Sequence, residues 1–247
     1  MRTHNRPPER RRRTRTPCVR LALGLALAAL SVPPSDAAEP ERAAATRSWY
    51  AQSLSRSDTE MNITHLWSAG AKFRAETVAR GHRLVTIVSG DSYYSYDALA
   101  LSGIAVRRAP AALAADSPDR RPFGNELELL LRAGGERVRD ESVAGNRLAV
   151  YQSTDEIGRR IVWVTDDERR LPVRVEIFDR ESGATRYKEY VDWVAGIEIP
   201  DAFFAPEPTV QLQRFELDEY LRKLAERDPA SAIPILYPEL LHGPAPD

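Results

Sequence analysis

The chain has 247 residues, of which 43% are hydrophobic and 29% are charged, and its formal net charge is −1. Residues 1–37 hold eight arginines and two acidic residues, so the remainder has 27 basic and 34 acidic side chains, a formal net charge of −7. Such a composition is ordinary for a globular protein with one substantial core. The acidic remainder lacks the overall positive charge that draws proteins to phosphate backbones, which argues against nucleic acid as a partner.

Residues 1–37 have the pattern of an export signal. Arginines at positions 10–13, 15 and 20 precede an apolar stretch at residues 21–32, and Ser35-Asp36-Ala37 follows with small residues at the positions that signal peptidase reads. The alternative is a membrane anchor, but twelve apolar residues are fewer than the roughly twenty that a spanning helix needs. We therefore predict a signal peptide cleaved after Ala37 and a periplasmic product.

Cys18 is the only cysteine of the chain, and it lies within the predicted signal. It precedes the apolar stretch, so it is not placed as the lipid-modified cysteine of a lipoprotein. The exported product would then have no cysteine. This excludes disulfides, thiolate nucleophiles and cysteine-based zinc sites, although the compartment permits disulfides.

The rest of the chain divides into one domain at residues 38–208 and a C-terminal helical extension at residues 209–247. Residues 41–54 predict an opening helix, because Ala43, Ala44, Trp49, Tyr50 and Leu54 are spaced roughly as on one helical face. Alternating polarity then predicts two groups of strands. The first group covers residues 59–68, 71–79, 82–89, 92–98 and 103–108, and the second covers residues 136–143, 146–154, 159–165, 172–179 and 185–194.

A loop at residues 110–122, with a helical turn at 111–115, and a helix at residues 125–132 separate the two groups of strands. Asn125 is the expected N-cap of this helix, and Leu127, Leu130 and Leu131 share one face. Tight turns at Gly81 and Gly90-Asp91 indicate antiparallel connections. The sequence therefore predicts an α+β fold, in which a large curled antiparallel sheet has helices over its concave side.

Several weak sequence blocks occur in a characteristic order and spacing: residues 67–74 (Trp-Ser-Ala-Gly-Ala-Lys-Phe-Arg), 93–97 (Tyr-Tyr-Ser-Tyr-Asp), 143–146, 161–164, 171–176 and 187–190. This order, over about residues 47–208, resembles the periplasmic outer-membrane lipoprotein carriers of the LolA type and their wider superfamily. The resemblance implies an unclosed β-barrel whose apolar lining, lidded by helices, holds the acyl chains of lipids or lipoproteins. It implies no cofactor and no catalysis.

The chain departs from the carriers at the arginine that ties the lid to the barrel. The carriers have an Arg-Pro pair in the second strand, whereas this chain has residues 71–75 (Ala-Lys-Phe-Arg-Ala) without a proline. Lys72 and Arg74 are both candidates for the tethering role, and the sequence does not decide between them.

The candidate ligand-binding residues are the larger apolar side chains of the predicted strands, together with the predicted lid. They are Trp67, Phe73, Val85, Ile87, Tyr94, Trp163, Val173, Val175 and Ile177, with Leu127, Leu130 and Leu131 as the lid. For each single residue, ordinary core packing is the alternative. Side chains alternate along a strand, so Tyr94 and Tyr96 face one side of the sheet and Tyr93 faces the other.

The C-terminal extension contains an amphipathic segment at residues 215–224, with Leu217, Tyr220, Leu221 and Leu224 at helical spacing. The apolar run at residues 233–241 is costly to expose, so we expect it to lie along the domain or across the mouth of the cavity.

Two other functions compete with a lipid carrier. One is a regulatory or scaffold module of the same fold, as in envelope-stress regulators resembling RseB, with an envelope protein as its partner. The other is ester hydrolysis at Ser92, because Gly90-Asp91-Ser92 resembles the nucleophile block of GDSL-type hydrolases; however, these enzymes need an Asp-x-x-His base, and His242 follows Glu239 instead. The histidines show no metal-ligand spacing. The pairs Arg107-Arg108, Arg159-Arg160 and Arg169-Arg170 are candidates for peripheral contact with the membrane, with exposed strand ends as the alternative.

Overall fold

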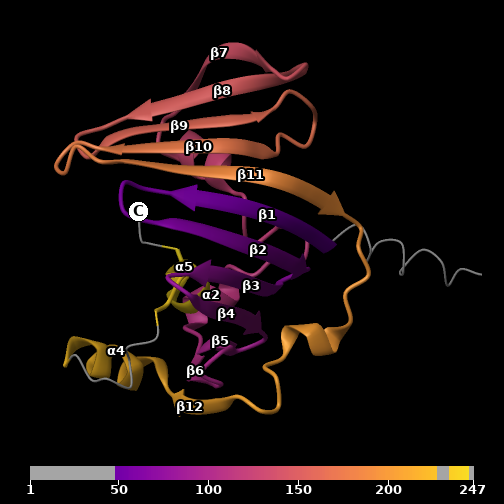
Figure 1. The fold of residues 1–247 in the computed structure, drawn as a ribbon, viewed down its shortest axis with the longest axis vertical. Coiled ribbons are helices and arrows are strands. Elements are labelled where there is room, and N and C mark those ends of the chain that lie inside the picture. The colour runs from indigo at the N-terminus through magenta and orange to yellow at the C-terminus, as the bar shows by residue number, and fades with distance from the viewer. Residues whose placement is uncertain (1–47, 227–233, 245–247) are drawn as a thin grey trace, which may run out of the picture. The chain divides into compact units, whose positions relative to one another are not determined.

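The computed structural model describes residues 48–226 and 234–244, and the strands of this part form a single sheet (Figure 1). The spatial order is β12-β6-β5-β4-β3-β2-β1-β11-β10-β9-β8-β7. The strands are β1 (Ser48–Arg56), β2 (Met61–Ala69), β3 (Lys72–Ala79), β4 (His82–Ser89), β5 (Ser92–Asp97), β6 (Ser102–Arg107), β7 (Glu136–Val143), β8 (Asn146–Thr154), β9 (Gly158–Thr165), β10 (Pro172–Asp179), β11 (Thr185–Ala195) and β12 (Gln211–Phe215).

Two antiparallel meanders make up this sheet. Strands β1 to β6 form one, strands β7 to β11 form the other, and β1 pairs with β11 to join them. β12 adds to β6 in parallel, so the sheet is mixed. β7 and β12 are its two edges, and it is neither closed nor strongly curled. The sheet is largely antiparallel, as predicted, but the fold is mostly β with few short helices rather than α+β, and the strong curl is not found.

The helical elements are short and few in the described chain. They are α2 (Pro110–Ala114), α3 (Glu126–Arg132), the 3-10 helix η1 (Asp201–Phe204), α4 (Leu217–Ala225) and α5 (Pro238–His242). α2 and α4 lie where the helical turn at 111–115 and the amphipathic segment at 215–224 were expected. α3 confirms the helix predicted at residues 125–132.

Most strand predictions are confirmed, several with the same bounds, because alternation of side chains and turn chemistry agree. Between β3 and β4, Arg80 and Gly81 have φ values of 49° and 82°. A two-residue turn with both φ values positive matches the twist of a hairpin, and glycine favours it.

The predicted opening helix is wrong over residues 48–54, which belong to β1; residues 41–47 lie outside the described part. β1 pairs with β2 on one side and with β11 on the other, so its backbone hydrogen bonds are made within the sheet. The burial of Ala51 and Ser53 follows the period of a strand. Hydrogen bonding to a strand on each side of β1 thus determines its conformation, despite the helical spacing of a few apolar residues.

The two faces of the sheet are covered by different elements. We call the face that bears Phe73, Tyr93, Tyr190 and Val175 the α3 face, since α3 covers part of it. We call the opposite face, which bears Val85, Ile87 and Tyr96, the η1 face, because Phe204 of η1 packs there. Tyr93 and the pair Tyr94 and Tyr96 lie on opposite faces, as alternation predicts.

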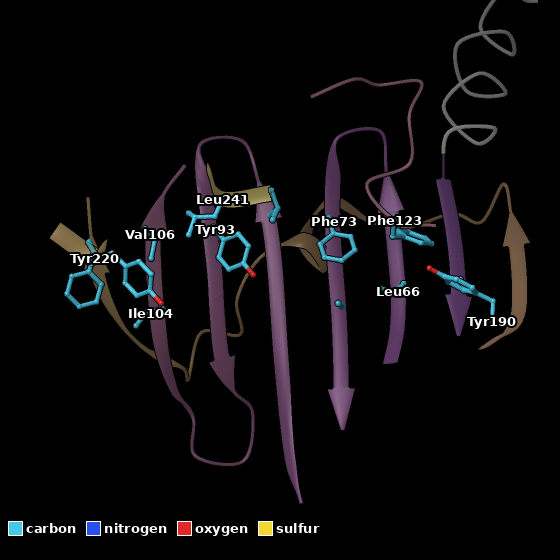
Figure 2. Close-up of a cluster of buried hydrophobic side chains, with 13 residues drawn as sticks. Leu66, Phe73, Tyr93, Ile104, Val106, Phe123, Tyr190, Tyr220 and Leu241 are labelled. Carbon is cyan, nitrogen blue, oxygen red and sulfur yellow. The ribbon is translucent and has the colours of Figure 1, made fainter. Parts of the chain in front are cut away.

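The C-terminal residues 234–244 lie along the domain and fill the α3 face over β3 to β6. The backbone N–H of Tyr237 donates to the Tyr93 hydroxyl at 3.3 Å, and the Ser95 hydroxyl donates to the carbonyl of Pro234 at 2.9 Å. The Tyr237 ring meets Phe73 edge-on, with centroids 4.8 Å apart. Figure 2 shows Leu241 beside Tyr93 within this buried cluster.

We predict that this C-terminal contact is a structural part of the core. Leu241→Ala should lower the free energy of unfolding by about 2–4 kcal/mol, because the side chain is 2% exposed and a cavity would remain. Leu224→Ala, at a side chain 48% exposed on α4, is the matched control and should change it by less than about 0.5 kcal/mol. Urea unfolding of both variants measures the difference, and equal stabilities would contradict the packing role.

Candidate functional site

A cavity of about 380 Å³ opens on the α3 face where the ends of β1 and β2 approach β10 and β11. Val175 and Ile177 of β10 give it an apolar wall. The rest of the lining is polar or charged: Ser55, Arg56, Ser57, Glu60, Asn62, Glu126, Arg186, Tyr187 and Lys188. The cavity therefore combines a short apolar surface with a charged surround.

Helix α3 covers the apolar layer next to the cavity. Leu127 and Leu130 are buried against β8, β9 and β10, in the cluster to which Val175 belongs and against which Ile177 packs. Leu131, expected to share this face, is 41% exposed. The expected N-cap is also absent: the side chain of Asn125 donates to the carbonyl of Arg121 at 2.7 Å instead. A seven-residue helix without a side-chain cap depends on its packing and anchors.

Glu126, at the first turn of α3, anchors the helix to β11. Its Oε1 accepts hydrogen bonds from Lys188 Nζ at 3.0 Å and from the Tyr190 hydroxyl at 2.7 Å. Burial disfavours the charged form of Glu126, but the charge of Lys188 and the two hydrogen bonds outweigh it, so the pKa of Glu126 lies below its ordinary value of 4.5. Burial, followed by the charge of Glu126, raises the pKa of Tyr190. Glu126 is thus ionised at neutral pH.

Aromatic packing fixes the loop that leads into α3. The Arg121 guanidinium lies over the rings of Trp49 and Trp193, at 4.6 and 4.9 Å from their centroids. Phe123 stacks on Trp193 at 5.7 Å. Gly124 has a φ of 70°, and a Cβ there would lie 2.4 Å from the Trp193 ring, so this position requires glycine.

The sequence-predicted binding residues divide between the two faces. Phe73, Val175, Ile177, Leu127 and Leu130 lie on the α3 side. The others pack in the clusters of the η1 face: Trp67, Val85, Ile87, Tyr94, Trp163 and Val173. Val175 and Ile177 line the cavity. The sequence assigned these residues to one lining, whereas neighbouring strands present them on both faces.

Both candidate tethers contact the η1 segment rather than α3. Arg74 is buried on β3, donates to the carbonyl of Phe203 at 3.0 Å and lies 4.6 Å from the centroid of its ring. Arg74 also binds Glu76, at 2.8 Å. Lys72 pairs with Asp201 at 2.6 Å, where both side chains are more exposed. Of the two residues, Arg74 therefore makes the more buried contacts, and both contact the 3-10 helix on the opposite face.

Sequence reasoning missed the charged residues of the cavity, although one signal was present. Arg186, Lys188 and Tyr190 alternate along β11, so their side chains point to the same face. Glu126 is the acidic residue that precedes the buried Leu127 of α3. Cations on one face of a strand and a carboxylate on the helix that covers this face indicate an ion pair between the helix and the strand.

The other chemical candidates have local partners. Ser92 donates to Asp91 at 3.0 Å, in the strand start after the turn, and Nδ1 of His242 lies 2.8 Å from the carbonyl oxygen of Gly243. His65 contacts the Tyr50 hydroxyl, and His82 contacts Asp97. Across residues 48–226 and 234–244, no group of three or more metal-ligating side chains is placed to hold an ion.

None of the helices in the described part of the chain combines the length and the apolar character needed to cross a membrane.

Comparison with solved structures finds similar folds at low sequence identity. An uncharacterized conserved protein from Thermus thermophilus is 10% identical, with a TM-score of 0.50 over 72% of this chain and 99% of that one. An outer membrane lipoprotein-sorting protein domain from Vibrio parahaemolyticus is 12% identical, with a TM-score of 0.33 over 70% of this chain and 97% of that one. The Pseudomonas aeruginosa MucA/MucB complex matches at 13% identity and a TM-score of 0.42, over 71% of this chain and 62% of that one.

The Thermus match, with a TM-score of 0.50, supports a shared fold and says nothing of activity. The other two matches have TM-scores below 0.5 and carry no argument. No protein-family model and no curated protein matches the chain.

We predict that the Glu126 anchor contributes to stability in a pH-dependent way. Glu126→Gln should lower the free energy of unfolding at neutral pH by about 1–3 kcal/mol, because charge-assisted hydrogen bonds are lost. The folded-state pKa is depressed, so this contribution is present above about 4.5 and is lost as the pH falls through the folded value. Urea unfolding of wild type and variant at several pH values measures the difference, which should shrink in acid.

The control for this anchor is Glu128→Gln on the same helix, where the carboxylate is 57% exposed and pairs with Arg120 at 3.3 Å. It should change stability by less than about 1 kcal/mol. A Glu126→Gln effect that stays constant into the acid range would contradict the anchor.

Proposed function

We propose that the chain is an exported, non-catalytic binding protein of the periplasm whose ligand is an acyl chain of a lipid or lipoprotein. Its place would be in outer-membrane lipoprotein sorting or in envelope lipid handling. The export pattern of residues 1–37 and the LolA-like fold support the compartment and the class of protein. The cavity beside α3 is the proposed binding site.

The observation that carries this proposal is the continuity between the cavity and the apolar layer beneath α3. Val175 and Ile177 belong to both, and Leu127 and Leu130 close the layer from above. An acyl chain that enters along these two β10 residues contacts apolar side chains of the sheet and of the helix. Ligand sites typically have such apolar walls with a few polar groups that orient the ligand.

The size of the cavity limits what it holds. A volume of about 380 Å³ is near the lower end of the roughly 300–1,000 Å³ typical of ligand sites. It suits a single chain, or part of one, rather than the whole multi-chain anchor of a lipoprotein. Larger cargo would require α3 to move away from the sheet.

Helix α3 is suited to serve as a movable lid in this proposal. It is only seven residues long, and it is joined to the sheet by two buried leucines and the Glu126 contacts. Gly134 follows it with a φ of 75°, which ends the helix. Short helices of this kind depend on tertiary contacts for their stability, so their displacement is local.

A second candidate function is a binding module for another envelope protein. On the η1 side, Ile63 pairs with Val78, and these residues are 39% and 51% exposed, with Met61 nearby at 67%. Exposed apolar groups on neighbouring strands favour protein contact. Cross-linking in the native envelope tests this candidate: a specific protein that is lost from the Val78→Lys variant would support it.

We predict that protein purified from its native envelope carries lipid, and that Ile177→Lys removes it. The substitution places a charge against the apolar wall, so an acyl chain would lose contact and meet an ammonium group. Mass spectrometry of an organic extract measures the lipid. Ile157→Lys, at a residue 68% exposed between β8 and β9, is the matched control and should retain wild-type lipid. Wild-type protein without lipid would count against the proposal.

For the hydrolase alternative, we predict that Ser92→Ala does not change ester cleavage by the purified protein. The Ser92 hydroxyl donates to Asp91 and lies at a hairpin turn, without the serine-to-histidine contact that activates a nucleophile among the described residues. A chromogenic short-chain ester provides the assay. Cleavage that Ser92→Ala abolishes would establish an enzyme.

A further inference from the structure

The charged groups that line the cavity do not balance one another. Its cations are Arg56, Arg186 and Lys188, and its carboxylates are Glu60 and Glu126. Lys188 pairs with Glu126 at 3.0 Å. Glu60 pairs with Arg80, which lies outside the lining. Both carboxylates are therefore already neutralised, and two arginines remain.

Of these two arginines, Arg186 presents its side chain on the α3 face, opposite Ile177 and beside the cavity. Each is exposed, and neither forms an ion pair within the portion of the chain that the structure describes. Arg56 lies over the Tyr187 ring at 4.8 Å, and Tyr187 points to the opposite face because it alternates with Arg186 and Lys188 along β11. A guanidinium group binds carboxylate and phosphate in a bidentate manner, so Arg186 favours an anion at the cavity.

The Glu126 carboxylate has a second feature that points to a ligand. Oε1 accepts both the Lys188 and the Tyr190 hydrogen bonds, whereas Oε2 is buried and has no hydrogen-bond partner among the described residues. Leaving a buried acceptor without a donor is costly. Glu126 lines the cavity, so a hydroxyl or amide N–H of a bound molecule is in a position to supply that donor.

We infer that the cavity selects a single-chain amphiphile whose headgroup is anionic and also carries a hydrogen-bond donor. The inference rests on the acyl-chain binding proposed above and specifies the class of ligand. The acyl chain lies along Val175 and Ile177, the donor reaches Glu126 Oε2, and the phosphate or carboxylate pairs with Arg186. An acylated glycerol phosphate has all three groups.

Four lauroyl or dodecyl compounds separate these contributions. Lauroyl glycerol phosphate has the chain, the hydroxyl and the anion; monolauroyl glycerol lacks the anion; lauroyl glycerophosphocholine masks it with a cation; dodecyl phosphate lacks the hydroxyl. Calorimetric titration of the delipidated full-length protein, below the micelle concentration of each compound, gives the affinities. Lauroyl glycerol phosphate should bind about tenfold or more tightly than each of the other three, and its affinity should fall as salt is added.

The variant Arg186→Gln tests this cation. It should lower the affinity for lauroyl glycerol phosphate by about tenfold or more and leave the affinity for monolauroyl glycerol unchanged. The matched control is Arg214→Gln, which removes the same charge from β12 and should alter neither affinity. Circular dichroism of each variant verifies the fold.

The outcomes separate the headgroup inference from acyl-chain binding itself. If monolauroyl glycerol binds as well as lauroyl glycerol phosphate, the anion preference is wrong and chain binding stands. If dodecyl phosphate equals lauroyl glycerol phosphate, the donor to Glu126 is wrong. If none of the four compounds binds, the proposed function itself fails. Equal losses in the test and control variants would also overturn the role of Arg186.

Discussion

The arrangement of the site depends on one irregularity in the pairing of β1 with β11. The register shifts between Gln52 and Ser53, so that Val191 is an extra residue on β11. Without this bulge, Tyr190 and Trp193 would point to opposite faces, because they are three residues apart. With it, both rings lie on the α3 face and stack at 4.8 Å. Tyr190 then binds Glu126, and Trp193 supports Phe123, so a single bulge positions both anchors of the lid.

An open sheet of this width leaves a large apolar area that has to be buried. Over β3 to β6, the chain uses its own C-terminal residues for this purpose, with Tyr237 and Leu241 among the buried contacts. Over β8 to β10 it uses α3. Space for a ligand therefore remains at the ends of β1, β2, β10 and β11, between these two coverings. The inner face is divided between a permanent core and a small cavity, in place of the single large hollow that the sequence suggested.

Local patterns in the sequence were sufficient to predict most of the strands, but not their three-dimensional partners. The alternation of Val173 to Asp179 identifies β10, and the turn at Gly81 defines the hairpin of β3 and β4. β12 was missed because its five residues form a strand only through parallel pairing with β6, which is remote in sequence. β1 was mistaken for a helix because its two sheet neighbours, which decide its conformation, are likewise absent from a local window.

The same limitation applied to the site. An apolar residue such as Trp163 or Ile87 looks like a lining residue in sequence, but its face is determined by the strand register and by bulges such as the one between Pro172 and Arg174. Charged residues were judged to be solvated because their partners lie on other elements: Lys188 is 62 residues away from Glu126. The polar half of the cavity could be recognised only when the helix was placed over the strand.

The way in which α3 is held links the binding of a ligand to the closing of the lid. The ion pair of Glu126 and Lys188 gains attraction but loses hydration, so its net contribution to holding the helix is modest. Burial of Leu127 and Leu130 supplies most of the remaining free energy that holds the helix. An acyl chain beneath the helix would contact these leucines in place of the apolar side chains of the sheet. Glu126 Oε2 still lacks a donor in the closed arrangement. A ligand that provides this donor favours the closed lid by its differential affinity, so chain and headgroup act on the same equilibrium.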